Sequence, residues 1–367
     1  MDFAFSEEQE MLRSQARSFL ESKFPEDKVV SIAESDDRSL DGVAWREIAE
    51  LGWMGLSVPE EHGGAGMGFL EETVLFETMG HALYPGPYFS TVGLALPLLK
   101  GDALERVVNG ESSATVAWLE DGPGLSLTSL EELGTKAERS NGSWTLTGVK
   151  DLVAGTESGG SIAVVARASE GVGVWLVDAG GDGVEVERLS TMDSTRPLAR
   201  VTLSGAPAEE LCAPGRSSEV LAKVRLRALV ALAVEAVGIS QKAFDLASAH
   251  AKEREQFDKP IGVYQAVSHQ VADMFVETEL ARSVAYWAAW CVAEDDDQAE
   301  AAAAAAKSIA SEAAVRSCER SIQVHGGIGF TWEHILHRYY KRAQWIAAFE
   351  GFPSTQRRAV AAALLDT

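Results

Sequence analysis

Arg254 begins the first of three segments near the end of the chain whose side chains could do chemistry. This segment runs to Gln265 and reads Arg-Glu-Gln-Phe-Asp-Lys-Pro-Ile-Gly-Val-Tyr-Gln. The guanidinium of Arg254 could bind a pyrophosphate through two parallel hydrogen bonds, and the ring of Phe257 could pack beside an adenine. A helix–turn–helix with a surface ion pair explains the same residues. Taken alone, the segment favours this simpler interpretation.

The second segment, residues 323–330, is rich in glycine and reads Gln-Val-His-Gly-Gly-Ile-Gly-Phe. Glycines allow a ligand to approach the backbone closely and leave bare amides to face a phosphate. The segment is not a Rossmann fingerprint, because no strand precedes it and the glycine spacing differs. A glycine helix stop followed by a turn is the competing interpretation. His325 alone indicates a structural histidine rather than a ligand.

The third segment centres on Glu350, which follows the apolar stretch from Trp345 to Phe349 and precedes Gly351. A carboxylate in apolar surroundings is partly desolvated, and this strengthens it as a base. For Glu350 considered alone, a surface carboxylate in contact with water is the simpler interpretation.

The elements that must position these segments change character twice along the chain. Helical spacing of apolar residues, opened by a capping box at Ser6 and Gln9, dominates residues 1–110. Residues 111–213 read as β-strands, and residues 214–367 return to helix. The sequence therefore predicts an α+β protein that is mainly α. It consists of an N-terminal helical domain, a middle antiparallel β domain and a C-terminal helical bundle of four long segments.

Charge and cysteine content exclude several classes of function. The formal net charge of −23 argues against nucleic acid or an anionic membrane as the main partner. The three cysteines are widely spaced and odd in number, which favours a reducing cytoplasm and no metal site. The N-terminus lacks the basic start and apolar run of a signal peptide, and no apolar stretch is long enough to span a bilayer.

Together the three segments resemble the C-terminal domain of acyl-CoA dehydrogenases. That family has Arg-x-Gln-Phe-Gly-x-Pro-Ile, then Gln-x-x-Gly-Gly-x-Gly, then Tyr-Glu-Gly-Thr ahead of Gln-Arg. The resemblance covers the whole chain: residues 5–9 are similar to the family's first helix and residues 52–66 to its N-terminal loop. Ala272-Asp273-Met274 also falls where the family has it.

In that family two chains share each FAD, so the resemblance implies an oligomer that binds FAD. One chain's β domain holds the flavin ring, and the neighbour's C-terminal domain holds the ADP end across a subunit interface. By this resemblance the residues expected to bind FAD are Arg254, Gln256, Phe257, Gln265, Gln323, Gly326 and Gly327.

The β domain departs from the family pattern. Residues 118–126 replace the family's Thr-Glu-Pro-x-x-Gly-Ser-Asp, and residues 150–155 read Lys-Asp-Leu-Val-Ala-Gly in place of Lys-Trp-Phe-Ile-Thr-Asn. Phe352 and Asp258 also replace a threonine and a glycine. The losses affect the flavin-facing half. They resemble the degenerate subunits of two-chain acyl-CoA dehydrogenases, such as those that shorten steroid side chains in actinobacteria, in which an intact partner holds the flavin ring.

The resemblance implies α,β-dehydrogenation of an acyl-CoA thioester with FAD, in lipid or steroid catabolism. The alternative is a non-catalytic, cofactor-supporting subunit of a heteromer, and another flavin chemistry such as an oxidase is a weaker option. Most of the family has its catalytic base at the position of Glu350, and a minority has it directly after the arginine, at Glu255. We prefer Glu350. The expected partners are an electron-transfer flavoprotein or similar acceptor, within a homotetramer or a heterotetramer with an intact homologue.

Overall fold

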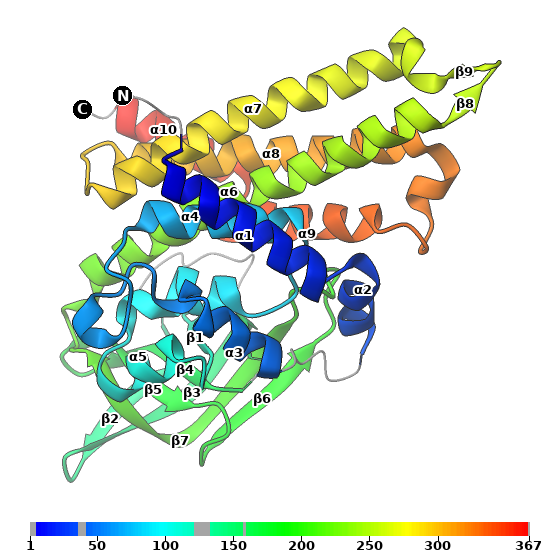
Figure 1. Cartoon of the computed structure of the whole chain (residues 1–367). Coiled ribbons are helices and arrows are strands. Elements are labelled where there is room, and N and C mark those ends of the chain that lie inside the picture. Colours follow the sequence, from blue (N-terminus) through cyan, green and yellow to red (C-terminus); the bar gives the residue numbers. More distant parts are fainter. Residues whose placement is uncertain (1–4, 36–41, 121–132, 157–158, 366–367) are drawn as a thin grey trace. The chain divides into compact units, whose positions relative to one another are not determined.

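The computed structural model describes residues 5–35, 42–120, 133–156 and 159–365 (Figure 1). The chain forms two compact units, each built from separate stretches of sequence. The first comprises Met1–Ala33, Phe69–Tyr84 and Leu229–Thr367, and the second comprises Glu34–Gly68 and Pro85–Ala228. Every site residue predicted from the sequence lies in the first unit.

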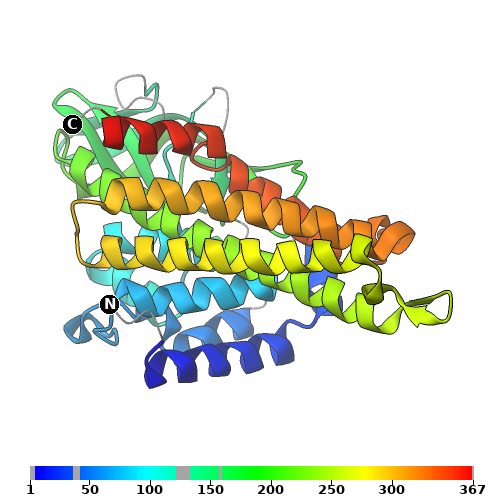
Figure 2. The same cartoon turned by 90° about the horizontal axis from the view of Figure 1, so that it is seen from above.

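The first unit is a bundle of helices. Its helices are α1 (Glu7–Lys23), α2 (Glu26–Glu34), α4 (Phe69–His81), α7 (Gln265–Ala293), α8 (Ala299–His325), α9 (Leu336–Ala348) and α10 (Pro353–Leu365), and α6 (Ser217–Glu253) enters it from the second unit. In Figures 1 and 2, α6, α7 and α8 lie side by side. The capping box predicted before α1 is confirmed, because Ser6 and Gln9 each donate a backbone N–H to the other's side chain at 3.1 Å.

Small residues allow these helices to pack closely. A Cβ added to Gly80 of α4 would lie 2.2 Å from the carbonyl oxygen of Glu235 in α6, so glycine is required at this crossing. Ser240 of α6 makes hydroxyl hydrogen bonds to Thr278 of α7 at 2.7 Å and to Ser317 of α8 at 2.8 Å. These bonds satisfy buried hydroxyls where the three long helices meet. The alanine run that precedes Lys307 lies within α8.

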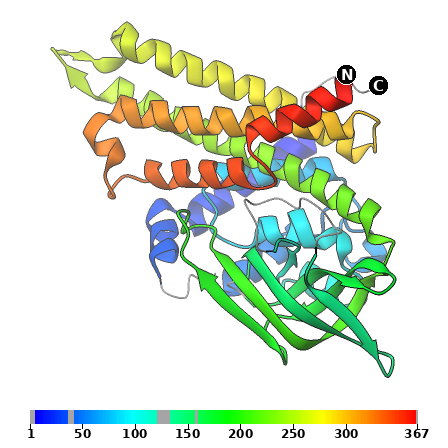
Figure 3. The ribbon, with the colours of Figure 1, turned by 180° about the vertical axis from the view of Figure 1, so that it is seen from behind.

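The second unit contains a seven-stranded sheet and short helices. Its helices include α3 (Gly42–Glu50) and α5 (Gly101–Val108). Its strands are β1 (Ala114–Ala117), β2 (Lys136–Ser140), β3 (Ser143–Ala154), β4 (Ser161–Ala168), β5 (Gly171–Asp178), β6 (Val184–Leu189) and β7 (Leu198–Cys212). The strands pair in the order β1-β4-β2-β3-β7-β5, β5 pairs again with β4, and β6 pairs with β7. A closed ring is therefore formed by β4, β2, β3, β7 and β5, because β5 pairs back with β4 (Figure 3). Its core contains buried Leu146, Val164, Trp175 and Val201.

The predicted fold class is confirmed, but three details differ from the sequence prediction. The sheet is mixed, because β1 pairs with β4 in parallel and β2 meets β4 in parallel at Lys136 and Arg167. A parallel pair requires a long connection, and the segment that contains the β2–β3 hairpin supplies it between β1 and β4. The prediction that the β domain is wholly antiparallel is therefore wrong.

The C-terminal part differs in the other two details. A short hairpin of β8 (Glu255–Gln256) and β9 (Lys259–Pro260) follows α6, although no strand is predicted there. The described chain from Ser217 onward has five helical segments rather than four, since α9 and α10 separate at Glu350. The three-domain division by residue range stays a prediction.

Candidate functional site

The first predicted segment forms the β8–β9 hairpin at the end of α6. Its two turn residues, Phe257 and Asp258, have φ values of 53° and 58°. Two consecutive positive φ values are typical of a tight two-residue hairpin turn, a conformation that aspartate tolerates and a bulky aromatic rarely adopts. The turn holds Phe257 in a strained conformation that costs about 1–3 kcal/mol. The ring of Phe257 is nevertheless 85% exposed.

The second segment ends α8 and continues into a short 3-10 helix, Gly326–Phe330. Gly326 has φ 64° and ψ −135°, a conformation that favours glycine. A Cβ added to Gly326 or Gly327 would meet no atom within 4 Å, so both glycines border open space. Their backbone is therefore accessible to a ligand.

The structure brings the first two segments together at one end of the bundle. The rings of His250, near the end of α6, and His325, at the end of α8, stack with centroids 4.3 Å apart. Figures 1 and 2 both show the β8–β9 hairpin and the end of α8 at this same end. All of the cofactor-binding candidates are exposed there, namely Arg254, Gln256, Phe257, Gln265, Gln323, Gly326 and Gly327.

Histidines fill the space beneath this surface without adding charge to it. His334 meets His325 edge to face at 4.6 Å, and His325 donates Nδ1–H to the carbonyl of Ser321 at 2.8 Å. Burial lowers the pKa of His250, His325 and His334, and proximity to one another adds to the effect for His250 and His334. The predicted structural role of His325 fits this neutral stack. Sequence reasoning missed His250 of α6 and His334, which precedes α9. Tertiary packing brings each of them against His325.

Glu350 lies at the break between α9 and α10. It has φ 56° and is followed by Gly351 at φ 96°, so the chain turns sharply here. The side chain of Glu350 is fully buried, with 0% exposure. The interpretation of Glu350 as a surface carboxylate is therefore wrong.

Gln356 of α10 holds this turn in place. Its Nε2 donates to the carbonyl oxygen of Glu350 at 2.5 Å and approaches that of Gly351 at 3.4 Å. Gln356 is only 1% exposed, so its amide bonds the backbone where water does not compete. The sequence placed Gln356 in a motif but gave it no role. Its spacing of six residues from Glu350 was the available signal.

Glu255, the alternative base, lies in a different setting. It is exposed in β8, in the hairpin that follows α6. Figure 3 shows this hairpin and the α9–α10 junction well apart. The two glutamates therefore do not form a pair of carboxylates in one site.

The two segments of the β domain that depart from the family pattern belong to the second unit. Leu152 has φ 56°, and the register of β3 against β7 shifts between Lys150 and Val153, which marks an irregularity in the strand. Val153 and Ala154 are buried. Most of the other departing segment, residues 121–126, lies outside the described residues.

Lys150 is the most perturbed charge in this region. Its side chain is fully buried and bonds Glu120 at 2.5 Å. Burial lowers the pKa of Lys150 to about 8, although the carboxylate of Glu120 opposes the shift. Glu120 also accepts hydrogen bonds from the backbone N–H groups of Gly134 and Thr135 at 2.5 and 3.0 Å. The Glu120–Lys150 pair therefore anchors β3 at Lys150, where the departing segment 150–155 begins.

Three negative observations complete the description. Within the described ranges, no group of three His, Cys, Asp or Glu side chains is arranged to hold a metal ion. Cys212, Cys291 and Cys318 are all free. None of the helices that the structure describes is both long and apolar enough to cross a membrane.

Comparison with known proteins identifies relatives along most of the chain. Residues 6–101 match the acyl-CoA dehydrogenase N-terminal domain, and residues 226–365 match the acyl-CoA dehydrogenase C-terminal domain. Acyl-CoA dehydrogenase FadE34 of Mycobacterium tuberculosis is 37% identical over 84% of this chain, which spans 40% of that relative's length. Acyl-CoA dehydrogenase IpdE2 of the same organism is 33% identical over 92% of this chain and 91% of its own length.

A solved structure agrees with these relatives. A chain of the ChsE4–ChsE5 complex from Mycobacterium tuberculosis is 27% identical, covers both chains in full, and has a TM-score of 0.89. The domain matches, the identities and the shared fold lead to one conclusion. The chain belongs to the acyl-CoA dehydrogenase family, which oxidises carbon–carbon single bonds.

Proposed function

We propose that this chain takes part in FAD-dependent α,β-dehydrogenation of an acyl-CoA thioester. The proton on the α carbon of a thioester is weakly acidic, so its removal needs a carboxylate base and hydrogen bonds to the developing enolate oxygen. FAD, when bound, supplies the acceptor for the hydride that leaves the β carbon. The base and the hydrogen bonds to the enolate oxygen must come from the protein.

The exposed end of the bundle fits the ADP half of FAD. The side chain of Arg254 makes no hydrogen bond to any described residue, so its guanidinium is available for a pyrophosphate. Gly326 and Gly327 leave open space above their backbone, and the exposed ring of Phe257 offers a face to an adenine. Gln256, Gln265 and Gln323 would supply further hydrogen bonds.

Glu350 is the base in this proposal. The observation that carries the proposal is that a fully buried carboxylate occupies a strained turn at the family's position for the base. Burial strengthens a carboxylate as a proton acceptor and excludes water that would compete for the proton. Gln356 fixes the backbone from which the carboxylate projects.

The experiment that tests this function is an anaerobic acyl-CoA titration of the purified protein. FAD is first counted per chain by absorbance, and short-chain, medium-chain and sterol-derived acyl-CoA thioesters are then added. Bleaching of the flavin absorbance is expected with at least one thioester. A protein that holds FAD and is not bleached by any thioester, with or without a partner chain, contradicts the proposal.

A second candidate is a cofactor-supporting subunit without an active site of its own. Leu152 and Ala154 stand where the family has an aromatic and a threonine that contact the flavin, and this observation favours the second candidate. Similarity to a chain of the ChsE4–ChsE5 complex, which contains two chain types, supports it further. Co-expression with an intact homologue separates the two candidates. Bleaching that requires the partner and is insensitive to Glu350→Gln favours the supporting role.

Both candidates require an oligomer, because the ADP-binding residues form only half of a cofactor site. Exposed apolar side chains on α7 and beyond α8 fit a surface that a second chain covers. They include Phe275, Val276, Leu280, Ile328, Phe330 and Trp332. A homotetramer or a heterotetramer, an electron-transfer flavoprotein or similar electron acceptor, and a cytoplasmic location remain parts of this proposal.

A further inference from the structure

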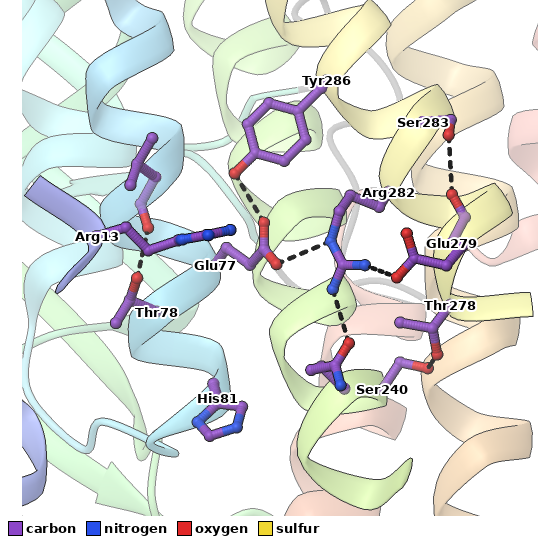
Figure 4. A network of polar contacts seen from close by, with 12 residues as sticks. Arg13, Glu77, Thr78, His81, Ser240, Thr278, Glu279, Arg282, Ser283 and Tyr286 are labelled. Carbon is purple, nitrogen blue, oxygen red and sulfur yellow. Dashed lines mark hydrogen bonds and ion pairs between the residues drawn. The ribbon is translucent and has the colours of Figure 1, made fainter. Parts of the chain in front are cut away.

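A cavity of about 410 Å³ lies among α1, α4, α6 and α7, all within the first unit. It is separate from the residues assigned to FAD and from Glu350, none of which lines it. Figure 4 shows the polar network along its wall. The groups in this network determine what the cavity could bind.

Most of the acidic groups that face the cavity are already paired. Glu77 accepts hydrogen bonds from Arg282 Nε at 3.1 Å and from the hydroxyl of Tyr286 at 2.7 Å. The other two guanidinium nitrogens of Arg282 bind Glu279 and Gln241 (Figure 4). The guanidinium of Arg282 is therefore used within the protein, and its single positive charge is shared between Glu77 and Glu279.

Asp245 is paired in the same way. Its carboxylate contacts His81 Nε2 at 3.0 Å and accepts from Gln241 Nε2 at 2.8 Å. Burial opposes ionisation of Asp245, but the hydrogen bonds from His81 and Gln241 outweigh it and hold the pKa of this carboxyl below its usual value. Asp245 is thus an ionised group, and each of its two oxygens has a hydrogen-bond partner.

The donors that remain come from α1. Arg17 makes no hydrogen bond to any residue in the described ranges. Arg13 makes one hydrogen bond, to Glu10 at 2.6 Å, and its guanidinium lies over the ring of Phe5, 5.1 Å from the centroid. The two arginines are four residues apart, so their side chains lie on the same face of α1, where like charges repel. An anion bound between them would relieve this repulsion and use their free N–H groups.

A second cavity of about 250 Å³ adjoins the first. The two share Arg17, Thr78 and His81 as lining residues. The second cavity is mainly apolar, with Leu20, Phe24, Pro25, Ala82 and Tyr339 in its lining. The carboxylate of Glu21 also lines it. At its rim Lys242 bonds Glu26 at 3.2 Å, so this carboxylate is neutralised. A pocket whose lining balances three arginines with three carboxylates, and in which Arg13 and Arg17 lie on one side, therefore opens directly into an apolar one. Together the two have the size of a small-molecule site.

We propose that the two cavities form one binding site for a small carboxylic acid with an apolar body. The carboxylate binds Arg13 and Arg17, and the apolar body lies against Leu20, Phe24 and Ala82. Inorganic phosphate matches only the arginine pair, and a neutral alcohol matches only the apolar part. The site is distinct from the proposed acyl-CoA site, and its test does not depend on catalysis.

Calorimetric titration of the full-length, FAD-loaded protein with sodium octanoate tests this site. Saturable binding of octanoate is expected, with octanol and inorganic phosphate each at least about tenfold weaker, because each lacks one of the two matching parts. The double variant Arg13→Gln, Arg17→Gln should bind octanoate at least about tenfold more weakly than the wild type. Arg46→Gln, at an exposed arginine of α3, is the matched control and should bind as the wild type does.

A separate substitution tests the apolar part. Ala82→Leu should occupy part of the second cavity and weaken octanoate binding while leaving the arginines in place. Circular dichroism of each variant establishes that it is folded, and if one variant is unfolded the other still decides the question. Equal octanoate binding by the wild type and a folded cavity variant, equal binding of octanol and octanoate, or no binding by the wild type would overturn the proposal.

Discussion

Arg254 and Phe257, at one end of the bundle, are the two residues that we propose contact the ADP half of FAD. The guanidinium of Arg254 is exposed, and Phe257 is held in a strained, left-handed turn conformation without burial of its ring. Strain costs free energy, and an exposed aromatic leaves apolar area in water that a bound group would cover. Both observations support the proposal that these residues contact a shared cofactor.

Replacing Arg254 with alanine should weaken retention of FAD. A charge-assisted contact to a phosphate is lost, so we expect FAD to dissociate about 10- to 100-fold more readily. Equilibrium dialysis followed by flavin absorbance measures this. Arg358→Ala, at another exposed arginine, is the control. Equal FAD retention in Arg254→Ala and the control would exclude Arg254 as a phosphate contact.

At the scale of elements, the break between α9 and α10 positions the proposed base. Gln356 bonds the carbonyl of Glu350 from the next helix, so the turn depends on two elements that are packed together. A non-glycine residue at positive φ is held in this conformation by its surroundings. Loss of this support should change the orientation of the Glu350 carboxylate more than its strength as a base.

Gln356→Ala should therefore lower the rate of flavin bleaching about tenfold or more while acyl-CoA affinity stays nearly unchanged, because small misplacements of a reacting group slow a reaction steeply. Stopped-flow absorbance gives the rate, and a substrate titration gives the affinity. Gln344→Ala, on α9, should leave both unchanged. A variant in which only the affinity falls would place Gln356 in substrate binding instead.

The stacked histidines that join α6 and α8 should make this end of the bundle sensitive to acid. Burial lowers the pKa of His250, His325 and His334 in the folded chain, so between their folded pKa values and about 6.5 the unfolded chain binds more protons. The stability that the neutral stack contributes is present above about pH 6.5 and is lost as the pH falls below it. His325→Phe keeps a ring but removes one of these titrations.

The measurement is the thermal unfolding midpoint at pH 5.5 and pH 7.5. The difference between the two should be smaller in His325→Phe than in the wild type, whatever the variant's absolute stability. The exposed His62→Phe should retain the wild-type difference. An unchanged pH dependence in His325→Phe would show that the stack does not carry the acid sensitivity.

The same elements show how far sequence reasoning reaches. Helix spacing, the capping box and the alternating strands predict the fold class, because the spacing of apolar residues along the sequence follows the period of the buried face. The left-handed turns at Phe257 and Glu350 could not be predicted, since neither side chain favours that conformation. The parallel pairing of β1 with β4 was also missed, because strand order depends on contacts between distant segments.

For the candidate site too, some features could be predicted from the sequence and others could not. The motifs identified the segments of Arg254, Gln323 and Glu350, and the packing of α6 against α8 brings the first two together. The burial of Glu350 and its support by Gln356 depend on tertiary contacts, which motif spacing does not carry. The roles of these residues in FAD binding and catalysis stay predictions.

At the scale of the whole molecule, the exposed apolar face of α7 should lie in a subunit interface. Phe275→Glu with Leu280→Glu would place two charges on this face, and burying them without partners is costly. We expect sedimentation velocity to show an oligomer for the wild type at micromolar concentration and a smaller species for the variant, which should also lose FAD. Met11→Glu, at an exposed apolar residue of α1, is the control. A wild-type monomer that keeps its FAD would contradict a shared cofactor site.

The central claim is that Glu350 removes the proton, and anaerobic bleaching of bound FAD by an acyl-CoA thioester tests it most directly. Glu350→Gln should bind the thioester as the wild type does but bleach about 10²- to 10⁴-fold more slowly, because an amide cannot accept the proton. Glu255→Gln, at the exposed glutamate of β8, should bleach at nearly the wild-type rate. Slow bleaching in Glu255→Gln with a normal rate in Glu350→Gln would contradict the account and place the base on the hairpin.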